Sequence, residues 1–243
     1  MSSEPRDESY VRTAFLERLA HELRGPAGVT FGALDQIERG VGGTGDPKLA
    51  AQLAMARRGV SRVVRTADRL QRAAQLERGN APFAMVHCDV RGIVESAAHT
   101  AQVIDARRGV TIDVTASSEP CMASIDAGWL VSAVGEIVTN AIRFASSKVR
   151  IDTRLEETEI RIAICDDGPG FSSPPSFGRF EAPARGSGLG LSLPLVHEVL
   201  GAHGGRLEIS HEEHEEHEER GERDGEGTGA SVILWLPRSQ TAS

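Results

Sequence analysis

The chain has 243 residues, 40% of them hydrophobic, which is enough apolar material for the core of one large domain or two modest ones. Its net charge of −8 comes almost entirely from residues 211–226, which hold nine acidic and two basic side chains. The remainder is nearly neutral, so the sequence excludes a general basic surface for nucleic acid.

The sequence also lacks the features of an inserted or secreted protein. No run of about 18 apolar residues is present, and residues 1–10 are polar rather than signal-like. Cys88, Cys121 and Cys165 lie far apart without metal-ligand spacing, so we expect reduced thiols. These observations predict a cytoplasmic protein without membrane insertion.

Two helices are expected first along the chain. Apolar residues recur at helical spacing over residues 8–37, glycines at 40–45 interrupt the pattern, and Asp46-Pro47 can begin a second helix. The second helix has a coiled-coil seam formed by Leu49, Leu53, Ala56, Val60, Val63, Ala67, Leu70 and Ala74. Because two helices alone bury little apolar surface, we expect two copies to form a four-helix bundle, and hence a homodimer.

Beyond residue 80, short strand-like runs alternate with helical stretches, which predicts an α+β sandwich with helices on one face of a mixed sheet. The expected strands are 110–115, 149–155, 160–165, 206–209 and 231–236, and the expected helices are 90–104, 128–143 and 189–202. Residues 168–187 are rich in Gly, Pro and Ser, as in a mobile lid. We therefore assign a helical domain to 8–79 and an α+β domain to 83–237.

His21 is the first candidate functional residue. It falls on the polar side of the first helix, opposite Leu16 and Leu19, where a histidine is usually only solvated. Its neighbour Glu22 could accept the imidazole proton and make the other ring nitrogen a better nucleophile. The pair is therefore a candidate for nucleophilic chemistry.

Three further segments have patterns that could be functional or purely structural. Glu136, Asn140 and Arg143 share one face of a predicted helix, where they could hold Mg²⁺ and a triphosphate or form an ordinary exposed polar face. Residues 164–171 (ICDDGPGF) follow a strand, as many plain turns also do. Residues 186–191 (GSGLGL) open a helix whose N-terminal N–H groups can bind phosphate.

Together these segments resemble the catalytic core of two-component sensor histidine kinases over about residues 10–237. Residues 20–26 (AHELRGP) resemble the phosphoacceptor box of the dimerisation domain. Residues 135–144 (GEIVTNAIRF), 164–171 and 186–191 resemble the N box, the D-x-G-x-G box and the second glycine box of the GHKL ATP-binding family. Residues 177–180 (FGRF) resemble the phenylalanine box of its lid.

The resemblance implies that the chain phosphorylates His21 from Mg-ATP with help from Glu22. The phosphoryl group then passes to an aspartate of a response-regulator receiver domain. It implies magnesium ligands at Asn140 and Glu136, although Glu136 is often asparagine in histidine kinases and glutamate in the hydrolysing ATPases. The implied nucleotide-binding residues are Asn140, Arg143, Asp166, Gly168, Gly170, Gly186, Gly188, Leu189 and Gly190.

Several alternatives remain open at this stage. Gly25 replaces the polar residue that in the family positions water for dephosphorylation, which predicts weak phosphatase activity.

The chain could also be a dimeric adaptor that no longer turns over ATP. A second alternative is a GHKL serine kinase or ATPase, to which Glu136 lends slight support. About ten residues precede the first helix, too few for an input domain, so we expect the signal to come through a partner, through the bundle itself or from a separately encoded sensor protein. We interpret residues 211–220 (HEEHEEHEER) as a solvated hairpin insertion rather than a metal site.

Overall fold

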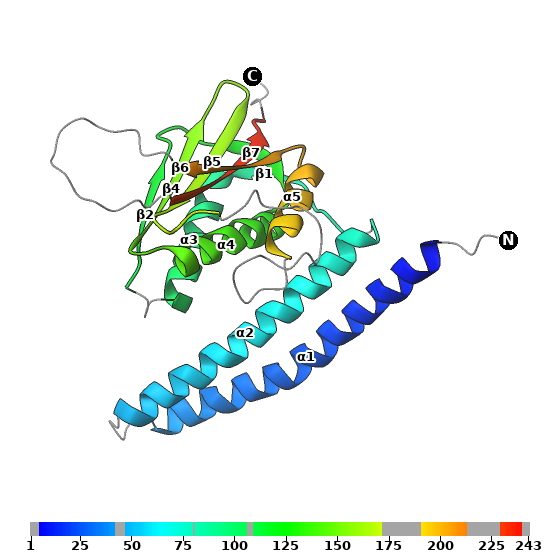
Figure 1. Cartoon of the computed structure of the whole chain (residues 1–243), viewed down its shortest axis with the longest axis vertical. Coiled ribbons are helices and arrows are strands. Elements are labelled where there is room, and N and C mark those ends of the chain that lie inside the picture. Colours follow the sequence, from blue (N-terminus) through cyan, green and yellow to red (C-terminus); the bar gives the residue numbers. More distant parts are fainter. Residues whose placement is uncertain are drawn as a thin grey trace. The chain divides into compact units, whose positions relative to one another are not determined.

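The computed structural model describes residues 5–41, 47–79, 81–105, 109–171, 191–212 and 229–239. The chain divides into two compact units, Met1–Pro82 and Phe83–Ser243. The first is a pair of long helices, and the second is a sheet with helices against it (Figure 1).

Unit 1 is an antiparallel hairpin of α1 (Pro5–Val41) and α2 (Pro47–Glu77), the two helices predicted from periodicity. Helix α1 continues through Pro26. Ion pairs join the helices along their length: Arg24–Asp68, Arg57–Asp35, Arg57–Glu38 and Arg78–Glu17. Since these side chains are partly exposed, each pair contributes about 1 kcal/mol or less.

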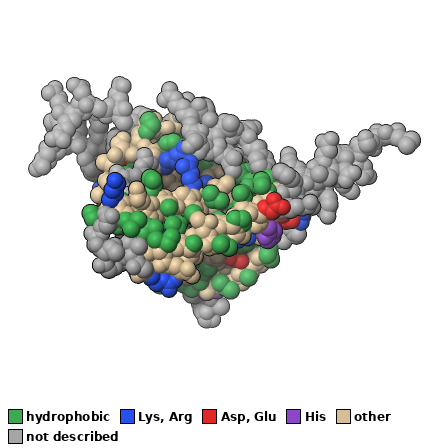
Figure 2. All heavy atoms as spheres, turned by 90° about the horizontal axis from the view of Figure 1, so that it is seen from below, with side chains coloured by type: hydrophobic (Ala, Val, Ile, Leu, Met, Phe, Trp, Pro, Cys, Tyr) green, Lys and Arg blue, Asp and Glu red, His purple; other side chains and the backbone are tan. Residues whose placement is uncertain are grey.

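The described side chains of unit 1 leave large apolar groups in solvent. Val29 is 76% exposed on α1 and Met55 is 65% exposed on α2, while Val63 of the predicted seam is 40% exposed. Figure 2 shows a face of the molecule on which hydrophobic side chains lie among mostly uncharged atoms. A seam residue left in water is expected of a hairpin that needs a further partner.

Unit 2 contains a five-stranded sheet in the order β2-β4-β5-β7-β6, in which β2 runs parallel to β4 and the other pairs are antiparallel. The strands are β2 (Thr111–Ala116), β4 (Lys148–Leu155), β5 (Glu159–Asp166), β6 (Arg206–Glu212) and β7 (Gly229–Pro237). The helices α3 (Val90–Asp105), α4 (Ala127–Phe144) and α5 (Ser192–Ala202) cover one face (Figure 1). The predicted α+β architecture is confirmed.

The core of unit 2 lies between this sheet and its helices. Ile160, Ile162 and Ile164 of β5 are at most 1% exposed, and they pair with Leu236, Leu234 and Val232 of β7. Because side chains alternate across a strand, Asp166 continues the same buried stripe at the end of β5. Its carboxylate therefore faces the helix layer and is 7% exposed.

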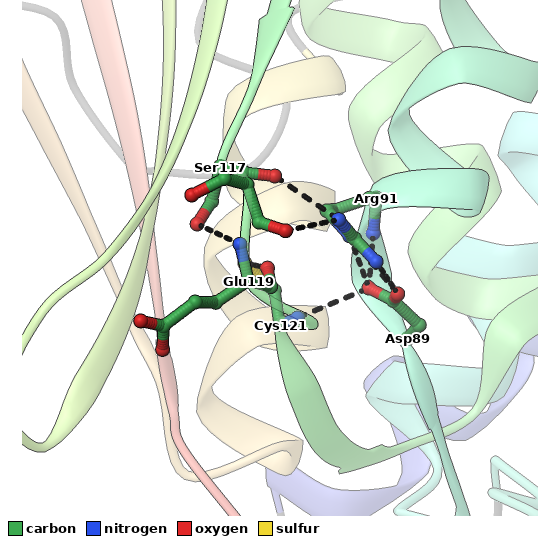
Figure 3. Close-up of polar contacts among 6 residues, drawn as sticks. Asp89, Arg91, Ser117, Glu119 and Cys121 are labelled. Atoms are coloured by element: carbon green, nitrogen blue, oxygen red, sulfur yellow. Dashed lines mark hydrogen bonds and ion pairs between the residues drawn. The ribbon is translucent and has the colours of Figure 1, made fainter.

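A two-stranded antiparallel ribbon of β1 (Val86–Asp89) and β3 (Met122–Ile125) was not predicted, because four residues are too few for a clear alternation. Its end is fixed by Asp89, which accepts hydrogen bonds from the Arg91 guanidinium and from the Cys121 N–H (Figure 3). Arg91 also donates to the Ser117 carbonyl at 3.0 Å. The hydrogen bond from Arg91 is the main reason that the pKa of Asp89 is lowered.

Candidate functional site

The predicted phosphoacceptor lies on the solvent side of α1. His21 and Glu22 are exposed, whereas Leu16, Ala20 and Ala27 of the same helix are buried. A Cβ placed on the nearby Gly25 would meet nothing within 4 Å. The His21 imidazole is thus available to a phosphoryl donor.

Helix α4 carries the second group of predicted residues. It begins at an N-cap, where the Asp126 carboxylate accepts a hydrogen bond from the Trp129 N–H at 3.0 Å. Its buried side includes Ile137, Val138, Ala141 and Ile142. This burial leaves Glu136, Asn140 and Arg143 half-buried on a common face, as the helical spacing predicts.

The turn after β5 packs against the end of α4. Asp166 accepts a hydrogen bond from the Gly168 N–H at 3.0 Å. A Cβ at Gly168 would lie 2.3 Å from the Phe144 carbonyl oxygen, so only glycine fits there. The glycine thus lets the turn pack directly against the end of α4. Gly170 has a φ of 69°, the left-handed region that favours glycine.

Asp167, for which the sequence predicts no separate role, ties the same turn to the α4–β4 connection. Its carboxylate accepts hydrogen bonds from the N–H groups of Ser146, Ser147 and Lys148 and from the Ser147 hydroxyl. Partial burial opposes ionisation, but these hydrogen bonds outweigh it and lower the pKa of Asp167 to about 2. The residue fixes the turn that presents Asp166.

Helix α5 approaches α4 at the predicted site. The Ser192 hydroxyl donates a hydrogen bond of 2.7 Å to Oε2 of Glu136. Gly186, Gly188, Leu189 and Gly190 of the predicted glycine box lie outside the described residues, and the described chain resumes at Leu191. The structure therefore brings the D-x-G turn and the start of α5 together against α4, which is the N-box helix.

The first residues of unit 2 are anchored to the same two helices. The Phe83 ring lies 5.1 Å from the Trp129 ring and 5.4 Å from the His203 ring, between ring centroids. Nε2 of His203 accepts a hydrogen bond from the Asp126 N–H, and Nδ1 of His203 donates one to the Val199 carbonyl. Nothing in the sequence indicates this role for His203.

The donor chemistry of α4 fits a magnesium ion. Asn140 and Glu136 are one helical turn apart and offer amide and carboxylate oxygens, the ligand type that Mg²⁺ prefers. Within the described ranges, no three His, Cys, Asp or Glu side chains gather as a protein-only metal site requires. Most of the 211–220 run lies outside the described residues.

Residues 125–240 match the sequence model of the histidine kinase-, DNA gyrase B- and HSP90-like ATPases. This segment spans the N-box helix, the D-x-G turn and the last two strands. Most of unit 2 is therefore similar to this class of ATPase domain, as the motifs indicated. In the part of the chain that the structure describes, every helix is too short or too polar to cross a bilayer.

Curated relatives extend the similarity into the helical unit. The chain is 24% identical over 216 residues to hybrid signal transduction histidine kinase D of Dictyostelium discoideum, covering 82% of this chain and 14% of that protein. It is 26% identical over 211 residues to the histidine-protein kinase AfsQ2 of Streptomyces coelicolor, covering 79% of this chain and 38% of that one. The chain thus spans well under half the length of these two relatives.

Solved histidine kinases share the fold. Full-length ShkA, crystallised with AMPPNP, matches 95% of this chain and 47% of its own with a TM-score of 0.65 and 21% identity. The Acinetobacter baumannii kinase AdeS matches 90% of this chain and 98% of its own with a TM-score of 0.57 and 21% identity. The resemblance to a sensor histidine kinase core is confirmed, and it supports histidine kinase function at the level of the family.

Proposed function

We propose that the chain is a protein-histidine kinase that phosphorylates its own His21 from Mg-ATP and transfers the phosphoryl group to an aspartate of a response-regulator receiver domain. The observation that carries this proposal is the combination of an exposed His21-Glu22 pair on α1 with ATPase motifs that converge on α4. The named relatives, which are histidine kinases, support it further.

In this proposal each motif residue has a distinct task. Asp166, nearly buried at the end of β5, accepts a hydrogen bond from the adenine amino group, and Gly168 and Gly170 shape the turn around it. Arg143 contacts phosphate, and Asn140 and Glu136 hold magnesium, which neutralises phosphate charge during transfer. The N–H groups of the glycine box Gly186, Gly188, Leu189 and Gly190 bind the phosphates.

The transfer itself is a displacement at the γ-phosphorus. A ring nitrogen of His21 forms the new N–P bond while the bond to the β,γ-bridging oxygen breaks and ADP leaves. Glu22 accepts the proton that the imidazole loses. The product is a phosphohistidine, which then donates its phosphoryl group to the receiver aspartate.

The proposal includes a homodimer built from the helical hairpin, since seam residues such as Val63 are exposed in one copy. It also includes a cytoplasmic reaction, where ATP is supplied. Gly25 supports weak phosphatase activity. The rate at which the kinase with ADP removes phosphate from a labelled receiver measures that activity, and a rapid loss would contradict the proposal.

The chemical stability of the product tests the proposed reaction. Purified chain incubated with γ-labelled ATP should acquire a label that is lost in acid and kept in alkali, as expected of phosphohistidine. An acid-stable label would indicate a serine kinase, and phosphate release without labelled protein would indicate an ATPase. If calorimetry detects no binding of nucleotide, the result would favour the alternative of a dimeric adaptor that no longer turns over ATP.

A further inference from the structure

The contact between Ser192 and Glu136 joins two elements far apart in the sequence. Ser192 is the first residue of α5, and its hydroxyl lies 2.7 Å from Oε2 of Glu136 in the middle of α4. Both side chains are half-buried. A hydroxyl at the start of a helix can cap that helix, but α5 has Leu191 at its cap position and no side-chain cap. The Ser192 hydroxyl bonds to the other helix instead.

This hydrogen bond constrains the carboxylate that the proposed function assigns to magnesium. A hydrogen-bond donor held by α5 favours the glutamate rotamer and carboxylate plane that keep this contact. Partners of this kind, which orient a metal ligand without touching the metal, commonly alter metal affinity when removed. The backbone on both sides is rigid, because Ile137 of α4 and Leu195 of α5 are buried.

We infer that Ser192 is a positioning residue for Glu136: it holds the carboxylate in the orientation in which it serves the magnesium of bound nucleotide. This inference rests on the proposed ATP-binding function and names a residue that acts through Glu136. It also makes the start of α5 a determinant of magnesium use, since any shift of Ser192 is transmitted to Glu136 through the hydrogen bond.

The test separates magnesium binding from nucleotide binding in the full-length chain. A fluorescent ATP analogue is titrated in EDTA, and its binding is then followed as Mg²⁺ is added. Ser192→Ala, which removes the donor, should leave affinity in EDTA within about twofold and raise the half-saturating Mg²⁺ concentration roughly 10-fold. Ser192→Thr keeps a hydroxyl and should restore the wild-type value to within about twofold.

A double-variant comparison shows whether Ser192 acts through Glu136. If it does, Ser192→Ala combined with Glu136→Gln should need no more Mg²⁺ than Glu136→Gln alone. Unchanged Mg²⁺ dependence in Ser192→Ala, equal weakening with and without Mg²⁺, or failure of Ser192→Thr to rescue would each overturn the inference. A wild-type chain that binds no analogue would instead overturn the proposed ATP-binding function.

Discussion

The two units of the chain differ in how many large apolar side chains each buries within a single copy. Among the side chains that the structure describes, every large one that is less than 2% exposed lies in unit 2, for example Leu130 and Ile162. Most of the described buried residues of unit 1 are alanines, and its exposed groups include Met55 and Val63. Burial of large apolar side chains is the main source of folding free energy.

This difference indicates a division of roles. Unit 2 has its own core, and its site residues are held by contacts inside the unit, such as those of Asp167 with residues 146–148. Unit 1 presents His21 on a hairpin that leaves part of its seam in water. We therefore expect unit 2 to be stable as a single copy and unit 1 to depend on association.

The largest expected effect is on the core of unit 2. Leu130 is fully buried in α4, so Leu130→Ala should lower the unfolding free energy of this unit by about 2–5 kcal/mol. Both tryptophans, Trp129 and Trp235, belong to unit 2, so their fluorescence during urea unfolding reports it selectively. The urea concentration at the unfolding midpoint of unit 2 should not change with protein concentration. A midpoint that rises with protein concentration would contradict the view that unit 2 is stable as a single copy.

A smaller effect is expected at the exposed seam of unit 1. Val63→Lys places a charge in the proposed bundle core and should weaken dimerisation roughly 10- to 100-fold, as measured by analytical ultracentrifugation. Val103→Lys is the matched control, because Val103 is 64% exposed on helix α3 of unit 2. Equal association of both variants and the wild type would show that this seam is not the dimer interface.

The smallest effect concerns Asp167 and depends on pH. Its pKa is lowered from the usual 3.8 to about 2 in the folded chain, so its stabilisation is present above about pH 4 and is lost as the pH falls toward 2. Asp167→Asn should therefore lower the unfolding free energy of unit 2 by on the order of 1 kcal/mol at pH 7. The difference in unfolding free energy between variant and wild type should shrink below pH 4.

Tryptophan-monitored urea unfolding at pH 7, 5 and 3 measures the Asp167 effect. Glu157→Gln, an exposed carboxylate between β4 and β5, is the control and should change little at any pH. A deficit of Asp167→Asn that stays constant from pH 7 to pH 3 would contradict the assigned cause.

Periodic features were predictable from the sequence, and contacts between distant residues were not. The face shared by Glu136, Asn140 and Arg143 follows from helical spacing, and the buried stripe that ends at Asp166 follows from strand alternation. The partnership of Ser192 with Glu136 joins positions 56 residues apart, and no local pattern encodes it. The ribbon of β1 and β3 was missed because its strands have four residues each.

The most direct test of the central claim is autophosphorylation of the full-length chain with γ-labelled ATP, compared between His21→Gln and His99→Gln. Both histidines are exposed on helices, but only His21 has the proposed role. We predict that His21→Gln abolishes the acid-labile label while nucleotide binding persists, and that His99→Gln is labelled like the wild type. Full labelling of His21→Gln would contradict the assignment of His21 as the phosphoacceptor.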